Sequence, residues 1–161
     1  MESARSHVVA LGAALLAISA PTHAQRSAKV RPELRVDAIA ARATSLQGGV
    51  GLAQPFGTYT RILGVVAAGV TTHHGRSVSA GRADLAVRFV LDPFGESRWS
   101  LYGTGGISVM YDELDEWRPV VFAALGAEGP RRGTVAPAFE LGLGGGVRVG
   151  FALRWVRGDL R

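Results

Sequence analysis

The chain has 161 residues, a net charge of +5 at pH 7 and no cysteine. This length suits one domain, and without cysteine the fold cannot depend on disulfides. The basic residues are nearly all arginines, scattered singly through apolar stretches, and the only lysine is Lys29. Because nucleic-acid binding needs a clustered basic patch, we expect no nucleic-acid partner.

The first 24 residues follow the order of a secretory signal peptide. Arg5 precedes an apolar run over residues 8–20, and Pro21, Thr22 and Ala24 follow the run. A membrane-spanning helix needs about 20 apolar residues, so we expect cleavage after Ala24 and not a retained anchor. Residues 25–161 are then the exported domain.

From residue 33 onward, apolar and polar residues alternate with a period of two. Turn-forming residues such as Pro93 and Gly95 interrupt this alternation about every 10 to 15 residues, which is typical of antiparallel strands joined by turns. The expected strands cover residues 33–42, 45–54, 58–72, 78–92, 98–111, 117–128, 134–143 and 147–157.

The run Gly144, Gly145, Gly146 lies between the last two of these segments. We interpret it as a turn, because a three-residue loop pairs Leu143 with Val147 and keeps the apolar residues of both strands on one face. A single strand through all three glycines would exceed the usual strand length. The turn gives an even number of strands.

The two faces of each strand differ strongly in polarity. In the fourth strand Leu85, Val87 and Phe89 share one face, while Arg82 and Arg88 lie on the other. In a soluble sheet the apolar face would pack into a core, whereas in a membrane barrel it would face lipid. Alternation alone does not separate these two cases.

Strand length and aromatic spacing favour lipid. Most of the segments reach the about 9–11 residues of a transmembrane strand, longer than the about 5–6 of soluble ones. Trp99 and Tyr111 share a face and are separated by roughly 40 Å along the strand, or about 28 Å at a 45° tilt. That separation matches two aromatic girdles, in which we also place Trp117 and Trp155.

In this orientation the charged faces line the lumen. An eight-stranded barrel is just wide enough for side chains to fill it, and buried charges must pair. We therefore expect a structural charge network that plugs the lumen, but arginines outnumber acids in the set, which leaves a narrow, anion-leaning channel as an alternative. The expected lumen residues are Arg35, Asp37, Arg82, Asp84, Arg88, Glu140, Arg148 and Arg154.

These features resemble the small outer-membrane β-barrel proteins of bacteria with two membranes. The segment "RVGFALRW" is similar to the assembly signal of that family, with Arg148, Gly150, Leu153 and Trp155 at its characteristic positions. In the family the aromatic residue usually ends the chain, whereas six residues follow Trp155 here. The resemblance implies an outer-membrane location, contact with lipid and lipopolysaccharide, and recognition by the barrel-insertion machinery.

Few residues indicate catalysis or metal binding. The side chains of His73 and His74 would point to opposite sides of an extended chain, which suits no single metal ion. Ser77 and Ser79 follow closely, but neighbours in sequence do not make a catalytic triad. The acidic run Asp112, Glu113, Asp115, Glu116 lacks the glycine and spacing of a calcium loop, and we interpret it as a solvated loop.

The sequence thus predicts an all-β protein, an eight-stranded antiparallel up-and-down transmembrane barrel that is monomeric and needs no cofactor or metal. Its expected role is structural or in surface interaction, without catalysis. Three competing functions stay open: the narrow anion-leaning channel, an outer-leaflet lipid-modifying enzyme, and a soluble periplasmic lipocalin-like binding barrel.

Overall fold

The computed structural model of the chain describes residues 30–94, 96–113 and 116–155. The expected signal peptide, residues 1–24, lies outside the described residues, as do Asp115 of the acidic run and residues 156–157 of the expected last strand. None of the described residues forms a helix long and apolar enough to cross a membrane.

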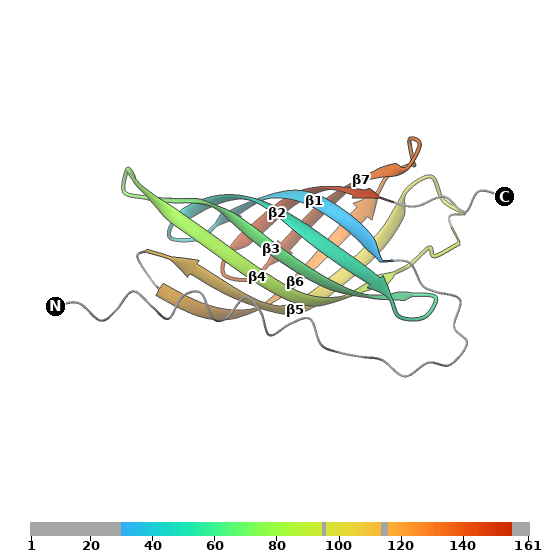
Figure 1. Cartoon of the computed structure of the whole chain (residues 1–161), viewed down its shortest axis with the longest axis horizontal. Helices are drawn as coiled ribbons and strands as arrows, with labels where there is room; N and C mark the ends of the chain where they lie inside the picture. Colours follow the sequence, from blue (N-terminus) through green and yellow to red (C-terminus); the bar gives the residue numbers. More distant parts are fainter. Residues whose placement is uncertain (1–29, 95, 114–115, 156–161) are drawn as a thin grey trace.

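The described chain folds into a closed antiparallel barrel in which each strand pairs with its neighbours in sequence and β8 closes on β1 (Figure 1). The predicted up-and-down barrel is confirmed, with strand ends within about two residues of the expected ones because alternation and turn residues mark them. The strands are β1 (Arg31–Ala40), β2 (Thr44–Pro55), β3 (Thr60–His73), β4 (Arg76–Val90), β5 (Ser100–Asp112), β6 (Glu116–Glu128), β7 (Val135–Leu143) and β8 (Val147–Trp155).

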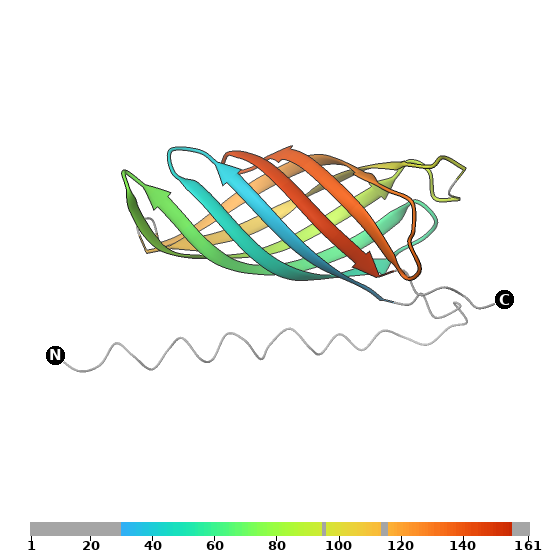
Figure 2. The ribbon, with the colours of Figure 1, turned by 90° about the horizontal axis from the view of Figure 1, so that it is seen from above.

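The two ends of the barrel differ in their connections. At one end, which we call the long-loop end, residues 56–59, 91–99 and 129–134 link the strands, and β1 begins and β8 ends there. At the other end, the short-turn end, residues 41–43, 74–75 and 144–146 form tight connections (Figure 2). The predicted glycine turn is confirmed, since Leu143 pairs with Val147 and Gly145 has a φ of 72°, a conformation that favours glycine.

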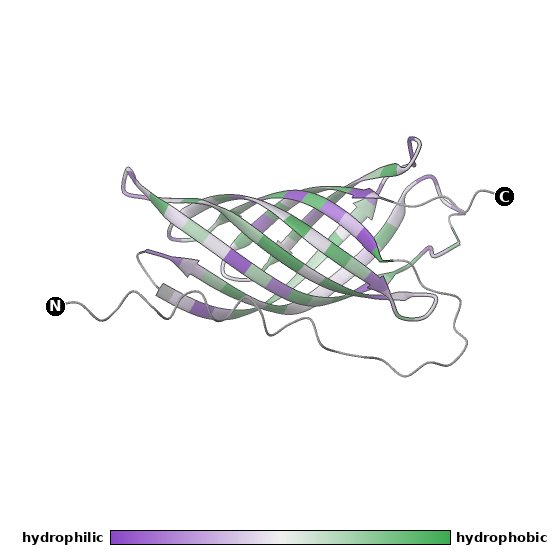
Figure 3. Ribbon diagram, in the orientation of Figure 1, coloured by the Kyte–Doolittle hydropathy of each residue, from purple (hydrophilic) through white to green (hydrophobic). Residues whose placement is uncertain are grey.

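The barrel wall is apolar outside and charged inside. Leu85, Val87 and Phe89 of β4 point outward and are 57%, 51% and 50% exposed, whereas Arg82 and Arg88, on the opposite face of the strand, are buried. The same alternation runs along β1, β2 and β8. Figure 3 shows hydrophilic and hydrophobic residues following one another along the strands. The predicted assignment of the two faces in β4 is therefore confirmed.

Small inward residues leave room for the large ones. Tyr102 of β5 pairs in register with Gly126 of β6, and a Cβ atom at Gly126 would lie 2.2 Å from Cζ of the Tyr102 ring. The glycine thus allows the ring to lie flat against the wall. Ala136, Ala138 and Ala152 are likewise buried, on two strands that also carry charged side chains of the lumen. This alternation of small and large residues fills a narrow barrel.

Candidate functional site

The main polar feature of the molecule is a buried set of charged side chains that crosses the lumen, which we call the charge network. Alternate residues of β1 supply three of its members, because side chains two apart on a strand point the same way. All eight residues expected in the lumen lie there and are at least nine-tenths buried. Among the described residues, the ion pairs no longer than 3.5 Å join Arg35, Arg82, Arg88, Arg148 and Arg154 to an equal number of carboxylates, Glu33, Asp37, Asp84, Glu128 and Glu140. Arg61 lies farther off, 3.7 Å from Glu128.

Glu140 is the centre of the half of the network nearer the long-loop end. Its Oε1 lies 3.2 Å from Nη2 of Arg88 and 3.1 Å from Nη2 of Arg154, and its Oε2 lies 2.6 Å from Nη2 of Arg35. These arginines belong to β4, β8 and β1, so one carboxylate of β7 binds three other strands. Charge-assisted bonds of this kind are the stronger hydrogen bonds of proteins.

Glu33 accepts hydrogen bonds from the same three arginines. Its Oε2 lies 3.2 Å from Nη1 of Arg88 and 3.1 Å from Nε of Arg154, while Nη1 of Arg35 reaches its Oε1 at 3.2 Å. Arg154 also donates to Glu128 at 2.9 Å. The guanidinium groups are therefore shared among several carboxylates instead of forming isolated pairs.

Tyr102 lies between two of these arginines. The guanidinium carbons of Arg88 and Arg154 lie 5.0 Å and 4.4 Å from its ring centre, a cation–π geometry. Nη2 of Arg154 also donates to the Tyr102 hydroxyl at 2.7 Å. The tyrosine thus fills space and satisfies a guanidinium at once.

The half of the network nearer the short-turn end is built on two aspartates. Asp37 accepts hydrogen bonds from both Nε and Nη2 of Arg35 at 2.8 Å, and these bonds link the two halves of the network. It also forms an ion pair with Arg82. Asp84 pairs with Nη2 of Arg148 at 2.9 Å and accepts a hydrogen bond from the Ser108 hydroxyl at 2.7 Å. Each aspartate therefore contacts side chains of more than one strand.

Three residues of the lumen that contact the arginines were not predicted from the sequence: Glu33, Glu128 and Tyr102. Glu33 has the same parity as Arg35 and Asp37, so extending the alternation by one step would have found it. Glu128 ends β6 on the same parity as the buried Phe122 and Ala124. With these two glutamates the five arginines of the network face five carboxylates, whereas the set predicted from the sequence held five arginines and three acids.

The expected girdle residues lie on the outside of the barrel. Tyr111 and Trp117 are cross-strand partners at the short-turn end, with ring centres 5.1 Å apart. Trp99 and Trp155 lie at the long-loop end, where β5 begins and β8 ends. The structure therefore places a pair of large aromatic side chains near each end, all of them exposed.

The residues that resemble an assembly signal lie along β8. Arg148 and Gly150 face the lumen, whereas Leu153 and Trp155 face outward. Gly150 has a local structural reason, because a Cβ atom there would meet Oδ1 of Asp37 at 2.5 Å. Packing against Asp37 of the charge network is therefore sufficient to explain the glycine at this position.

The structure does not bring the weaker catalytic candidates together. The His73 ring contacts the His74 ring and the carbonyl oxygen of Arg42, whereas Ser77 bonds to Thr72 on the outer face of the same hairpin. His73 lines a cavity of about 440 Å³ at the short-turn end, together with Arg42, Ser45 and Thr71. No cluster of three or more metal-ligating side chains occurs in the described part of the chain.

No protein-family model and no curated protein matches the sequence.

Proposed function

We propose that the protein is an outer-membrane β-barrel, exported through its signal peptide, with a structural or surface-interaction role and a lumen closed by the charge network. The observation that carries this proposal is the inverted polarity of the wall. Monomeric soluble proteins rarely expose apolar patches larger than about 300–600 Å². Here large apolar side chains are exposed on every strand, including Val50 of β2, Val66 of β3, Val121 of β6 and Leu141 of β7.

The same observation argues against a soluble binding barrel. A lipocalin-like barrel would hold apolar side chains inside to receive its ligand, and water would meet the polar face. Arg35, Arg88 and Asp37 instead occupy the interior, at most 3% exposed. In hydrocarbon, a closed barrel also leaves no backbone hydrogen-bonding group at an open edge.

The charge network supports a closed lumen. Its guanidinium and carboxylate groups are fixed on one another across the barrel, between the small cavity of the long-loop end and the larger one of the short-turn end. Because the five arginines and five carboxylates of the network balance, this crossing of the lumen carries no net charge that would draw anions through it. We therefore propose a plug in place of a channel and a protein without catalytic activity.

Membrane washing tests the location. Cell membranes that contain the protein are extracted with carbonate or urea, and the protein is then followed by immunoblotting. We expect it to stay in the membrane pellet together with a known integral barrel, and release into the wash would overturn the proposal. Separation of inner from outer membranes on a density gradient then assigns the compartment.

Two further measurements address the channel and the lipid-modifying enzyme. Purified protein in a planar bilayer is expected to give no steady current, and a stable anion-selective conductance would favour the channel. Mass spectrometry of lipid A from cells with and without the gene is expected to show identical species. A difference in acylation between the two would favour the enzyme.

A further inference from the structure

Two arginines at the long-loop mouth of the lumen, Arg31 and Arg61, are only weakly paired with the charge network. Nη1 of Arg61 lies 3.7 Å from Oε2 of Glu128, beyond hydrogen-bond distance, and that oxygen is already bound by Arg154 at 2.9 Å. Neither Arg31 nor Arg61 donates a side-chain hydrogen bond to another described residue. These two arginines therefore add positive charge to the long-loop mouth of the lumen, outside the balanced network.

The strand register brings these charges close together. Arg61 of β3 is the direct cross-strand partner of Arg88 of β4. Like charges placed opposite each other on neighbouring strands repel. The Arg61 side chain is only 16% exposed, so water screens this repulsion poorly. Arg131, in the loop after β6, adds a further positive charge near Arg31.

A small void lies between the arginines. Its volume is about 10 Å³. The positively charged residues that line it are Arg31, Arg61, Arg88 and Arg154, and the negatively charged ones are Glu33 and Glu128. A void of this size holds about one water molecule or one ion of similar size. Water could satisfy donors there, but it would leave the excess charge of the arginines in place.

We propose that this mouth binds a single monatomic anion of halide size, held between the guanidinium groups of Arg31 and Arg61. The anion offsets the repulsion between Arg61 and Arg88 and accepts hydrogen bonds from N–H groups of Arg31 and Arg61 that no other described residue accepts. Movement deeper into the lumen is opposed by the carboxylate of Glu140, which is paired with Arg88 and Arg154. This site does not depend on whether the barrel lies in a membrane.

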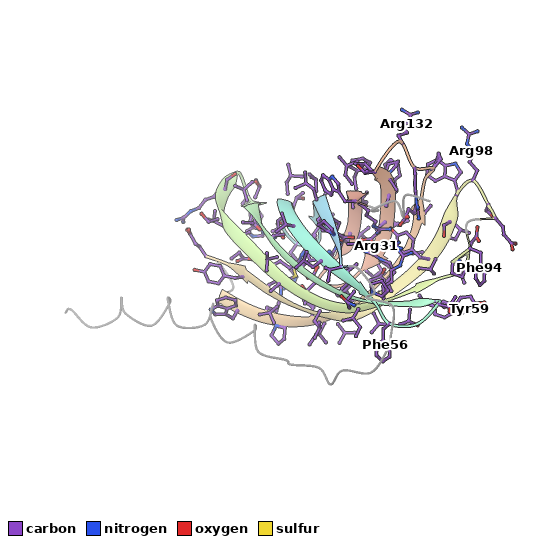
Figure 4. All side chains as sticks on the ribbon, turned by 45° about the vertical axis from the view of Figure 1, so that its right-hand side comes forward. Arg31, Phe56, Tyr59, Phe94, Arg98 and Arg132 are labelled. Atoms are coloured by element: carbon purple, nitrogen blue, oxygen red, sulfur yellow. The ribbon has the colours of Figure 1, made fainter. Side chains whose placement is uncertain are left out.

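Anomalous diffraction with bromide tests the proposal on the full chain. Crystals of the purified protein soaked in sodium bromide are expected to show an anomalous peak within contact distance of both Arg31 and Arg61. The Arg31→Gln/Arg61→Gln variant should lose the peak. The matched control is Arg98→Gln/Arg132→Gln, which removes two exposed loop arginines from the same end without changing the void (Figure 4), and it should keep the peak.

Chloride magnetic resonance provides a second readout that needs no crystal. Wild-type protein and the Arg98→Gln/Arg132→Gln control in neutral detergent are expected to broaden the ³⁵Cl signal, and Arg31→Gln/Arg61→Gln should reduce the broadening to that of detergent alone. Circular dichroism of each variant checks that the barrel has formed. Equal broadening by all three proteins would overturn the proposal.

Competition distinguishes halide from larger anions. Inorganic phosphate should leave the bromide peak in place, because a phosphate is too large for the void. If phosphate bound at this mouth while bromide gave no peak, the halide site would be wrong and an oxyanion or a lipid phosphate would take its place. Density for water alone in the bromide crystals would also overturn the proposal.

Discussion

Replacement of Glu140 by glutamine tests whether the charge network acts as one unit. The change keeps the size of the side chain but removes a charge that contacts three guanidinium groups, from Arg35, Arg88 and Arg154. Because Glu140 is only 8% exposed, water cannot replace the lost carboxylate. Breaking a buried ion pair on one side costs about 3–5 kcal/mol, so we expect a loss of that size in the free energy of unfolding.

The assay is urea unfolding of the refolded protein in lipid vesicles, followed by tryptophan fluorescence and by the mobility of unheated samples in gels. The matched control is Glu96→Gln, since Glu96 is an exposed carboxylate of the loop between β4 and β5. We expect it to change the stability by less than about 0.5 kcal/mol. If Glu140→Gln were as mild as this control, the network would not hold the barrel together.

A double-mutant cycle then separates the lost charge from the lost contact. In Glu140→Gln/Arg88→Gln one positive and one negative charge are removed together. We expect the double variant to be more stable than the sum of the single changes predicts, by about 0.5–3 kcal/mol, which is the usual coupling of residues in one network. Strict additivity would show that Arg88 and Glu140 act independently.

Three further changes probe the wall and its filling. Leu85→Arg on the outer face should destabilise the barrel in vesicles by about 2–4 kcal/mol if the residue faces the bilayer core. Ser79→Arg, nearer the short-turn end, should lower the free energy of unfolding by less than about 1 kcal/mol. Equal losses in the two unfolding titrations would contradict the burial of Leu85 in lipid. Gly126→Ala places a methyl group against the Tyr102 ring, so we expect overpacking to lower the free energy of unfolding by about 1–3 kcal/mol in the same titration. An unchanged unfolding midpoint would contradict this close packing. A variant that retains only Trp117 among the tryptophans should lose fluorescence in vesicles of brominated lipid, whereas fluorescence unaffected by bromine would place that girdle residue in water.

The architecture could be predicted from the sequence because its signals are local. Alternation in a stretch such as Arg82 to Leu91 fixes strand and face together, and Pro93 or the three glycines at 144–146 mark where the chain turns. Even the glycine turn could be chosen over a long strand, since it alone keeps Leu143 and Val147 as partners on one face. These decisions need only neighbouring residues and the period of a strand.

The pairing inside the lumen could not be predicted, because it depends on the stagger between strands. Arg154 meets Glu33, Glu128 and Glu140, which lie on β1, β6 and β7. Nothing local to Arg154 indicates these partners, and shifting one strand would exchange them. The same stagger places Arg61 opposite Arg88, a repulsive contact that composition alone would not reveal.

The charge network also gives the barrel a reason to close in a single register. In an antiparallel pair a slip of one residue sends every side chain to the opposite face. A slip of β8 by one residue would turn Arg148 and Arg154 to the outer wall and leave Glu33, Asp84 and Glu140 without these partners inside. An apolar lumen of the same volume would tolerate such a slip more easily, and it would often be no less stable than buried ion pairs. We therefore attribute to the network the specificity of closure in addition to any gain in stability, and the unfolding and coupling measurements on Glu140 and Arg88 test the contribution to stability.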